Sequence, residues 1–485
     1  MKIFLFVFIL LFSTIKIFGQ HFSQYNTGTL YDSFENPSQR AFIPDSSRMF
    51  SFNFLVPNLN GNFLLNGDAQ ATLKSRYFLN MYNNTLLKLG QGQLNNVNGD
   101  ANIYLFMAKL FLSFDGDEEI GFSIQSRAEG KGIFSDDAIS LLNGTQGFSN
   151  NTTYPNAFNG NFYYQTYNQV SFTYKEKIDD QITVGAKGSI LLGTAYSNLD
   201  VVNSNGSFNT NTGSAYLALQ GHYKSAYQPS QANSSYFSPN FRNPGLAISV
   251  GTTYKAGDGY VLQGNIKDLG HIHWSGLSNF YKFNSSGTIS GSGTTTKEDS
   301  VYHLASSIVH NNLAQGAFST PIDGKAELSI SKNYWINGEE IKYSPTFVAS
   351  KELFYRGYAV AWVNPFQYRD YVVTLTPAYD NLNTFTMGLQ FMMKTPNFEF
   401  FIGSDKIIQS LGLLGDKISH PAQFTDNPAF TGGSIFLGFS LKFGDVIEHP
   451  MNAAYVPGGF NHNGFFRNLF EKIFKKNDVK PSWGE

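Results

Sequence analysis

Residues 433–443 read Gly-Ser-Ile-Phe-Leu-Gly-Phe-Ser-Leu-Lys-Phe, and this stretch decides the fold. Large apolar residues alternate with small or polar ones, and Phe436 is the one large apolar residue on the polar side. A strand turns successive side chains to opposite faces, so one face is apolar and the other mostly polar. Such a strand fits a sheet between a soluble core and water, and it fits equally a barrel wall between lipid and a wet lumen.

The composition of the chain favours the barrel. Charged residues make up 14% of the 485 residues and aromatic residues 16%. Soluble domains carry about 25% charged residues, whereas outer-membrane barrels carry aromatic girdles on an apolar outer face. The net charge of −2 supplies no field for a polyanion, so we expect no nucleic-acid partner. The chain has no Cys, which excludes a disulfide framework and a thiolate metal site.

The N-terminal residues have the pattern of an export signal. Residues 1–19 combine Lys2, an apolar run over 3–15 and a cleavage site before Gln20, so we assign them to a signal peptide. The apolar run is shorter than the about 20 residues that a membrane-spanning helix needs. A buried N-terminal helix is the alternative interpretation. Residues 20–47 are polar and irregular, and we expect them to form a periplasmic or plug segment.

Alternating segments between residues 48 and 443 predict an all-β, transmembrane antiparallel barrel of about 14 strands, within a range of 12–16. With the N-terminus in the periplasm, the connections on that side are short and five of the seven outer ones are long, which is typical of outer-membrane barrels. This division of the connections into periplasmic and outer ones places the strand-like patch 214–223 in an outer connection. Pro345 and Pro377 each lack the N–H that a strand residue donates to its neighbouring strand, which weakens the assignment of strands 341–350 and 370–379. A soluble β-sandwich or propeller is the alternative. The predicted strands are 48–56, 103–114, 120–127, 162–174, 182–192, 246–250, 260–269, 324–335, 341–350, 353–363, 370–379, 384–394, 398–405 and 433–443.

The chain continues beyond the predicted last strand as a tail, residues 444–485. Apolar residues from Phe465 to Phe474 recur at helical spacing, with basic residues opposite them. We expect an amphipathic helix in a periplasmic tail. It could lie on the inner leaflet, close the barrel from below, dock on a periplasmic or membrane protein partner, or pack on the rim of its own barrel.

Four stretches resemble a family of outer-membrane barrels of unknown function found in Bacteroidota. The family is distantly similar to long-chain fatty-acid transporters and to the barrel subunit of the type IX secretion system that shuttles cargo. The resemblance implies fourteen strands and supplies no catalytic or ligand residue. His271 stands where the family pattern has an aromatic residue. The stretches are Phe34-Glu-Asn-Pro-Ser-Gln-Arg-Ala-Phe42, Pro44-Asp-Ser-Ser-Arg48, Ile266-Lys-Asp-Leu-Gly-His-Ile-His-Trp274 and Thr395-Pro-Asn-Phe-Glu-Phe-Phe401.

Few residues suggest a catalytic or ligand-binding site. His271 and His273 would share a strand face, but a metal site needs a third ligand such as Asp268, and two polar aromatic residues near the membrane interface are the simpler interpretation. The acidic run 115–119 lacks the spaced ligands of a calcium loop and is interpreted as a solvated turn. Lys267 and Asp268 could form a lumen ion pair or hold a strand kink. We therefore predict no catalytic, cofactor-binding or metal-binding residues, no cofactor and no enzyme activity.

Two functions are the main candidates from the sequence; a barrel enzyme with a lipid substrate is a third, which would need an acidic or serine site at the outer rim that the sequence does not reveal. The first is an outer-membrane transporter or channel for a small molecule, hydrophobic ones included, with a hatch formed by residues 20–47 or by a short helix over 135–142 capped by Ser135. The alternative is a non-enzymatic scaffold or accessory subunit of an outer-membrane secretion or assembly complex. Both place the protein in the outer membrane of a Gram-negative cell, surrounded by its lipids, with both termini periplasmic.

Overall fold

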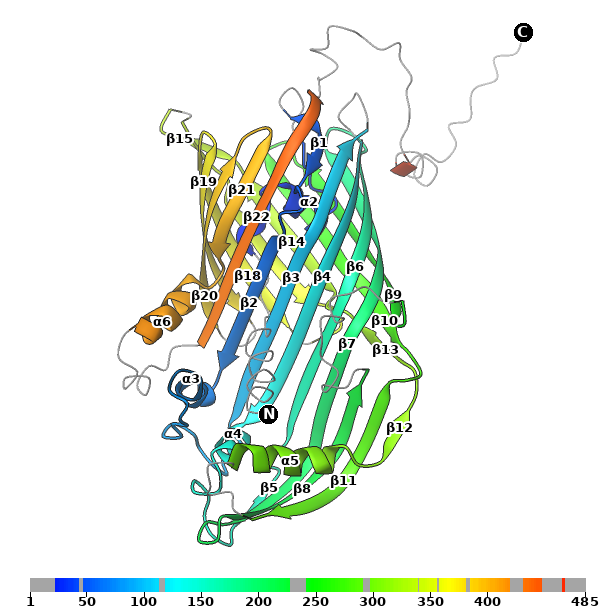
Figure 1. Ribbon diagram of the computed structural model, residues 1–485. Coiled ribbons are helices and arrows are strands. Elements are labelled where there is room, and N and C mark those ends of the chain that lie inside the picture. The colour runs from blue at the N-terminus through cyan, green and yellow to red at the C-terminus, as the bar shows by residue number, and fades with distance from the viewer. Residues whose placement is uncertain are drawn as a thin grey trace, which may run out of the picture.

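The structure, a computed structural model, is a closed antiparallel barrel of fourteen strands. It describes residues 22–42, 47–112, 118–226, 241–290, 297–338, 340–355, 357–380, 384–418, 431–446 and 465–466. The predicted fold is confirmed. Figure 1 shows the wall of the barrel with the long strands β3, β4, β6 and β7 running beyond its lower end. Among the described residues, no helix is both long and apolar enough to cross a bilayer.

The wall closes where the last strand pairs with the first. β22 pairs with β1 and β2, which follow each other along one strand line, and both pair with β3 on the other side. β13 and β14 likewise share one line beside β10. The wall segments are β1 (Arg48–Phe52), β2 (Asn58–Asn66), β3 (Leu94–Phe111), β4 (Glu118–Ser135), β6 (Gly160–Lys177), β7 (Ile182–Asn209), β9 (Pro244–Lys255), β10 (Tyr260–Trp274), β13 (Phe318–Pro321), β14 (Lys325–Lys332), β17 (Thr346–Glu352), β18 (Tyr358–Tyr368), β19 (Tyr371–Asp380), β20 (Phe385–Lys394), β21 (Phe398–Ser404) and β22 (Thr431–Val446).

Side chains alternate between the two faces of the wall as the sequence predicts. In β22, Ile435 and Phe443 are exposed on the outside, whereas Ser440 and Lys442 are buried inside. The outer face carries aliphatic and aromatic side chains around the ring, such as Leu328 and Trp362. An apolar outer face and a polar inner face are what a bilayer and a wet lumen require of a barrel.

Several predicted bounds are wrong. The connection predicted at 58–100 contains β2 and the first residues of β3, and the fifth strand, predicted at 182–192, runs to Asn209 as β7. Pro345 lies just before β17, so the predicted strands 341–350 and 353–363 are shifted to 346–352 and 358–368. Pro377 lies inside β19 and pairs with Met387, because its missing N–H interrupts only the ladder to β18.

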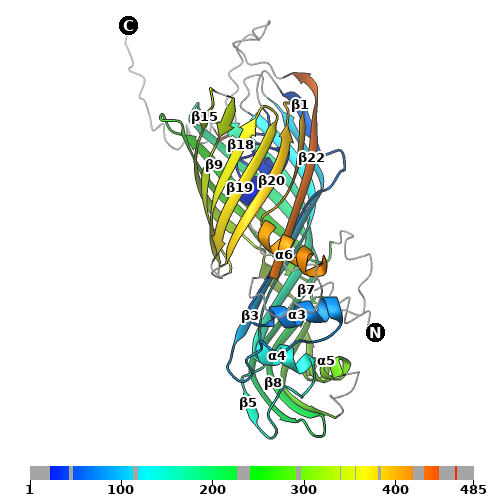
Figure 2. The same cartoon turned by 90° about the vertical axis from the view of Figure 1, so that its left-hand side faces the viewer.

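The long strands continue into an extension beyond the barrel, with its own hydrophobic core (Figure 2). The patch predicted at 214–223 is a strand here, outside the barrel wall as expected. At the opposite end, the hairpin β15 (Tyr334–Ile336) and β16 (Ile341–Tyr343) prolongs the wall. The extension comprises α3 (Ala69–Leu79), α4 (Asp136–Leu142), β5 (Thr153–Pro155), β8 (Ser214–Ser225), β11 (Asn279–Ile289), α5 (Lys297–Val309) and β12 (Leu313–Gln315).

Candidate functional site

Residues 22–42, the N-terminal segment, lie inside the barrel (Figure 1). The segment folds into a short 3-10 helix, η1 (Phe22–Gln24), and the helix α2 (Leu30–Glu35). Thr29 caps α2 by accepting a hydrogen bond from the N–H of Asp32 at 3.2 Å. The Asp32 carboxylate in turn accepts from the N–H groups of Thr27 at 2.9 Å and Gly28 at 3.1 Å. These hydrogen bonds, all within the segment, shape the turn and the start of the helix.

One side of α2 packs on apolar side chains that point into the lumen. Leu30, Tyr31 and Phe34 are buried against inward-facing residues of the wall, and Tyr31 meets Phe401 edge-on at 5.9 Å. Phe436 belongs to this cluster, which accounts for the large apolar residue on the polar side of β22. Burying three such side chains stabilises the docked segment by about 1.5–3 kcal/mol each. The wall residues of the cluster are Tyr104, Met107, Val372, Met392, Phe401 and Phe436.

The backbone of the segment is held by charged side chains from several strands. Glu399 accepts from the N–H of Leu30 at 2.8 Å, and Lys394 donates to the carbonyl of Gly28 at 2.8 Å. From β3, which lies beyond β22 and the β1–β2 line, Lys109 donates to the carbonyl of Ser33 at 3.1 Å. Charge-assisted hydrogen bonds are stronger than neutral ones, so these contacts fix both ends of α2.

Two glycines give the segment room to lie against the wall. Gly185 of β7 and Gly251 of β9 face each other in the ladder. A Cβ at Gly185 would lie 2.0 Å from the carbonyl oxygen of Pro37, and one at Gly251 would lie 2.3 Å from Oδ1 of Asn36. Glycine at 185 permits the close approach of the Pro37 backbone, and glycine at 251 leaves room for the Asn36 side chain.

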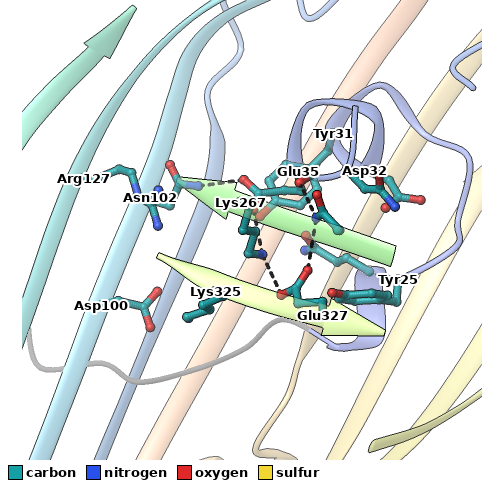
Figure 3. Close-up of a pocket in the computed structure, with 13 residues that line it drawn as sticks. Tyr25, Tyr31, Asp32, Glu35, Asp100, Asn102, Arg127, Lys267, Lys325 and Glu327 are labelled. Atoms are coloured by element: carbon teal, nitrogen blue, oxygen red, sulfur yellow. Dashed lines mark hydrogen bonds and ion pairs between the residues drawn. The ribbon is translucent and has the colours of Figure 1, made fainter. Parts of the chain in front are cut away.

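An ionic cluster joins the end of α2 to three strands (Figure 3). Lys267 of β10 lies 3.2 Å from Glu35 and 3.1 Å from Glu327 of β14. Glu35 also accepts from the hydroxyl of Tyr104 at 2.8 Å and from the amide of Asn102 at 3.3 Å, both on β3. Removing one partner of such a buried pair leaves the other charge uncompensated.

A bulge in β10 brings a second acidic group into the lumen. The ladder to β9 shifts between Ile266 and Leu269, and Asp268 takes φ 54°, with its N–H donating to Ser249 Oγ at 2.9 Å. Its carboxylate pairs with Arg127 and lies 3.2 Å from Lys187. The sequence suggested that Lys267 and Asp268 form a lumen ion pair or hold a strand kink. Both residues form ion pairs in the lumen, and both lie at the bulge of β10.

A cavity of about 40 Å³ lies between the segment and these charges. Among the described residues that line it, Gln24 has no hydrogen-bond partner for its side-chain amide, and Oδ1 of Asn102 and of Asn265 are also without one. The space suits ordered water, because a buried water needs two to four polar partners. The space between the segment and the wall is thus small and polar.

The other residues singled out from the sequence do not join this site. His271 and His273 are exposed on the outer face, while Asp268 is buried in the lumen, so the three cannot share a metal. No group of three candidate ligands occurs in the described part of the chain. The interpretation of 115–119 as a solvated turn is wrong for Glu119, which is buried beside Lys175 at 2.5 Å; residues 115–117 lie outside the described residues. α4 begins at Asp136 with Ser135 as its cap, as predicted, but it packs in the extension.

Acid should loosen the N-terminal segment. Burial by itself would raise the pKa of Glu35, but Lys267, Lys187 and Arg127 outweigh it and lower the pKa to about 2. The ionised carboxylate then stabilises the docked segment above its ordinary pKa, by on the order of 3 kcal/mol, and this contribution is lost as the pH falls toward 2. Because the chain has no Cys, a nitroxide on Arg40→Cys, an exposed position of the segment, reports docking by EPR. We expect its immobile component to shrink between pH 5 and 3.

The Asp32 carboxyl should make docking depend on pH in the opposite direction. Burial raises its pKa to about 7, although the N–H groups of Gly28 and Thr27 oppose the shift. Docking therefore favours the protonated acid and weakens as the pH rises from about 4 to 7. Asp32→Asn should remove the decline between about pH 4 and 7, and Glu35→Gln should remove the loss below pH 5. A spectrum that does not change with pH in the unmodified segment would contradict both assignments.

The docked segment could have been found from the sequence by one signal. Inward positions of the wall should be polar if they face water, yet Phe436, Met392, Val372 and Met107 are large and apolar. Apolar residues on the lumen face of a barrel need a partner inside it. The partners on residues 22–42 are not evident from that segment alone, because Leu30, Tyr31 and Phe34 are too few to show a period.

The solved structures to which the chain is similar differ widely from it in sequence. No functionally curated protein matches the chain. A Pseudomonas putida toluene transporter, TodX, is 9% identical, with a TM-score of 0.40 over 88% of this chain and 95% of that one. A Pseudomonas aeruginosa FadL homologue is 11% identical, with a TM-score of 0.38 over 84% and 92%. The translocator domain of autotransporter NalP from Neisseria meningitidis is 6% identical, with a TM-score of 0.30 over 82% and 90%. The model of a family of unknown function, DUF5723, matches residues 41–405, and the chain belongs to that family.

Proposed function

We propose that the protein is an outer-membrane channel for a small molecule and that residues 22–42 are its removable plug. One observation carries the proposal. Within the described residues, every backbone–backbone hydrogen bond of the segment stays inside the segment, and the wall holds it through side chains. The ladders of the barrel do not depend on it, so the segment can leave without opening the wall.

The orientation follows from the lengths of the connections. The barrel begins at Arg48 and ends at Val446, which pair with each other at the end where the turns are short. Short turns are periplasmic in outer-membrane barrels, so we place both termini in the periplasm and the extension outside the cell. A plug that enters from the periplasmic end can be withdrawn toward that side.

The lining of the lumen favours a small polar cargo. Inward-facing charges occur at several levels of the barrel, including Lys175 with Glu119, Lys187 with Asp268, and Lys442 with Glu399 at 2.7 Å. Charged walls accommodate polar solutes and discriminate between ions. A hydrophobic cargo entering from outside, which the resemblance implies, would meet the aromatic residues around Trp274 at the outer end of β10 and would then have to cross this charged zone.

A disulfide should lock the plug and stop transport. The hydroxyls of Ser38, in the segment, and Thr253, in β9, lie 2.9 Å apart, so Cys at both positions can reach the geometry of a disulfide. We expect liposomes carrying the oxidised Ser38→Cys/Thr253→Cys variant to pass no small sugar or amino acid, and reduction to restore the flux of the unmodified protein.

The chain offers a matched control for this lock. Ser171 of β6 and Ser189 of β7 face the same lumen, and their hydroxyls are also 2.9 Å apart, but both belong to the wall. The Ser171→Cys/Ser189→Cys disulfide should leave the flux unchanged. Equal flux through the oxidised plug variant and the control would overturn the proposal.

An accessory role in a secretion or assembly complex is the second candidate. The extension has a hydrophobic core of its own, which is more structure than the connections of a simple channel require. At the other end, Phe466 of the tail donates its N–H to Glu176 at 2.7 Å, and its ring lies 5.5 Å from that of Tyr174. A native pull-down of the full chain, with and without residues 444–485, should recover a periplasmic or membrane partner that depends on the tail. Recovery of the barrel alone from both would count against this role.

A further inference from the structure

The helix α6 (Ile407–Ile418) lies on the outer surface of the barrel at the level where the extension begins (Figure 2). Ser410 and Gln409 tie it to the wall. Ser410 Oγ accepts from the N–H of Ser434 in β22 at 3.2 Å, and Gln409 donates to the carbonyl of Phe385 in β20 at 3.1 Å. Leu413 lies over Gly433 of β22, within 4 Å of a Cβ built there. One face of the helix is therefore fixed to two strands.

The opposite face of α6 is aliphatic and uncovered. Ile408, Leu411 and Leu414 are exposed by 56%, 58% and 56% of their surface, and their spacing of three residues places them on one side of the helix. From residue 407 to residue 415 the sequence contains no charged residue. A helix in contact with water would carry polar side chains at these positions.

We propose that the acyl chains of the surrounding bilayer cover this face, so that α6 lies in the membrane interface and marks its boundary. The apolar outer wall supports this choice, because α6 lies against two of its strands. The two strands that hold α6 expose Phe385, by 51%, and Ile435, by 62%, on the same outer face. An amphipathic helix lies in the interface with its apolar face in the acyl boundary. The extension, on the far side of α6, then stands entirely in water.

Lipid quenching tests the proposal on the full chain. A bimane fluorophore on Leu411→Cys, in vesicles of phospholipid brominated on the acyl chain, should be quenched strongly, and more by bromines near the headgroup than by bromines near the chain end. Leu328→Cys on β14, 69% exposed on the barrel wall, is the control for lipid contact, and Asn211→Cys, exposed in the β7–β8 turn, is the control for water. We expect quenching at residue 411 to approach that at residue 328.

Two results would overturn the assignment. Quenching at residue 411 no greater than at residue 211 would show that the face lies in water. Weak quenching, together with efficient cross-linking of two barrels through the thiol of the Leu411→Cys variant, would show that a second copy of the chain covers the face. Because the labelled side chain is exposed in the structure, the variant keeps all contacts of α6 with the wall. Its heat-modifiable migration, the usual sign of a folded barrel, serves as the folding control.

Discussion

Replacing Gly185 by valine should expel the plug from the lumen. The new Cβ would lie 2.0 Å from the carbonyl oxygen of Pro37 and 2.2 Å from its carbon, and neither backbone atom can move without displacing the segment. Overpacking costs about 1–3 kcal/mol even where neighbours yield, so docking should weaken by roughly tenfold or more. The nitroxide at Arg40→Cys should change from mostly immobile to mostly mobile.

Gly188→Val is the matched control for this prediction. Gly188 lies on the same strand, but a Cβ there meets nothing within 4 Å, and valine suits a strand. The spectrum of the control should equal that of the parent. If Gly185→Val also left the nitroxide immobile, the approach of Pro37 to the wall could not be as close as described.

Replacing Lys267 by methionine should be the most destabilising single change in the lumen. Glu35 and Glu327 would both lose the cation between them, and breaking a buried pair costs about 3–5 kcal/mol. We expect a marked fall in the urea midpoint for unfolding from lipid vesicles. Adding Glu35→Gln and Glu327→Gln to this variant should restore much of the loss, because neutral amides no longer need a counter-charge.

A surface pair provides the comparison. Lys177 pairs with Asp180 at 2.7 Å, but the Asp180 side chain is 97% exposed. Exposed pairs contribute about 0–1 kcal/mol, so Lys177→Met should barely change the midpoint. Equal effects of Lys267→Met and Lys177→Met would mean that the charges around Glu35 are solvated rather than buried.

Much of the wall could be predicted from the sequence, because alternation reports directly on a surface between lipid and lumen. Each predicted strand has its counterpart in the barrel, and the errors occur where another force decides. Pro345 lies before its strand because a proline cannot donate into a ladder. β7 runs past its predicted end because it continues into the extension, where it pairs with β5 and β8.

The plug could not be predicted as a contact, because it depends on pairs of residues far apart in the chain. Gly185 and Gly251 look like ordinary strand glycines until Asn36 and Pro37 are placed against them. Lys267 and Asp268 stood out as a charged pair in an apolar strand, yet their partners Glu35 and Arg127 come from other elements. A single sequence shows which residues are unusual, and only the fold shows what they bind.

Conductance in planar bilayers tests the central claim most directly, namely that residues 22–42 close a membrane-spanning lumen. The unmodified protein and Gly188→Val should both show only brief openings, enough for the flux expected of the unmodified protein in liposomes. Gly185→Val, reconstituted at the same density and shown to be folded, should give long-lived openings of uniform size. Closed bilayers with all three proteins, or equal steady conductance from all three, would contradict the account.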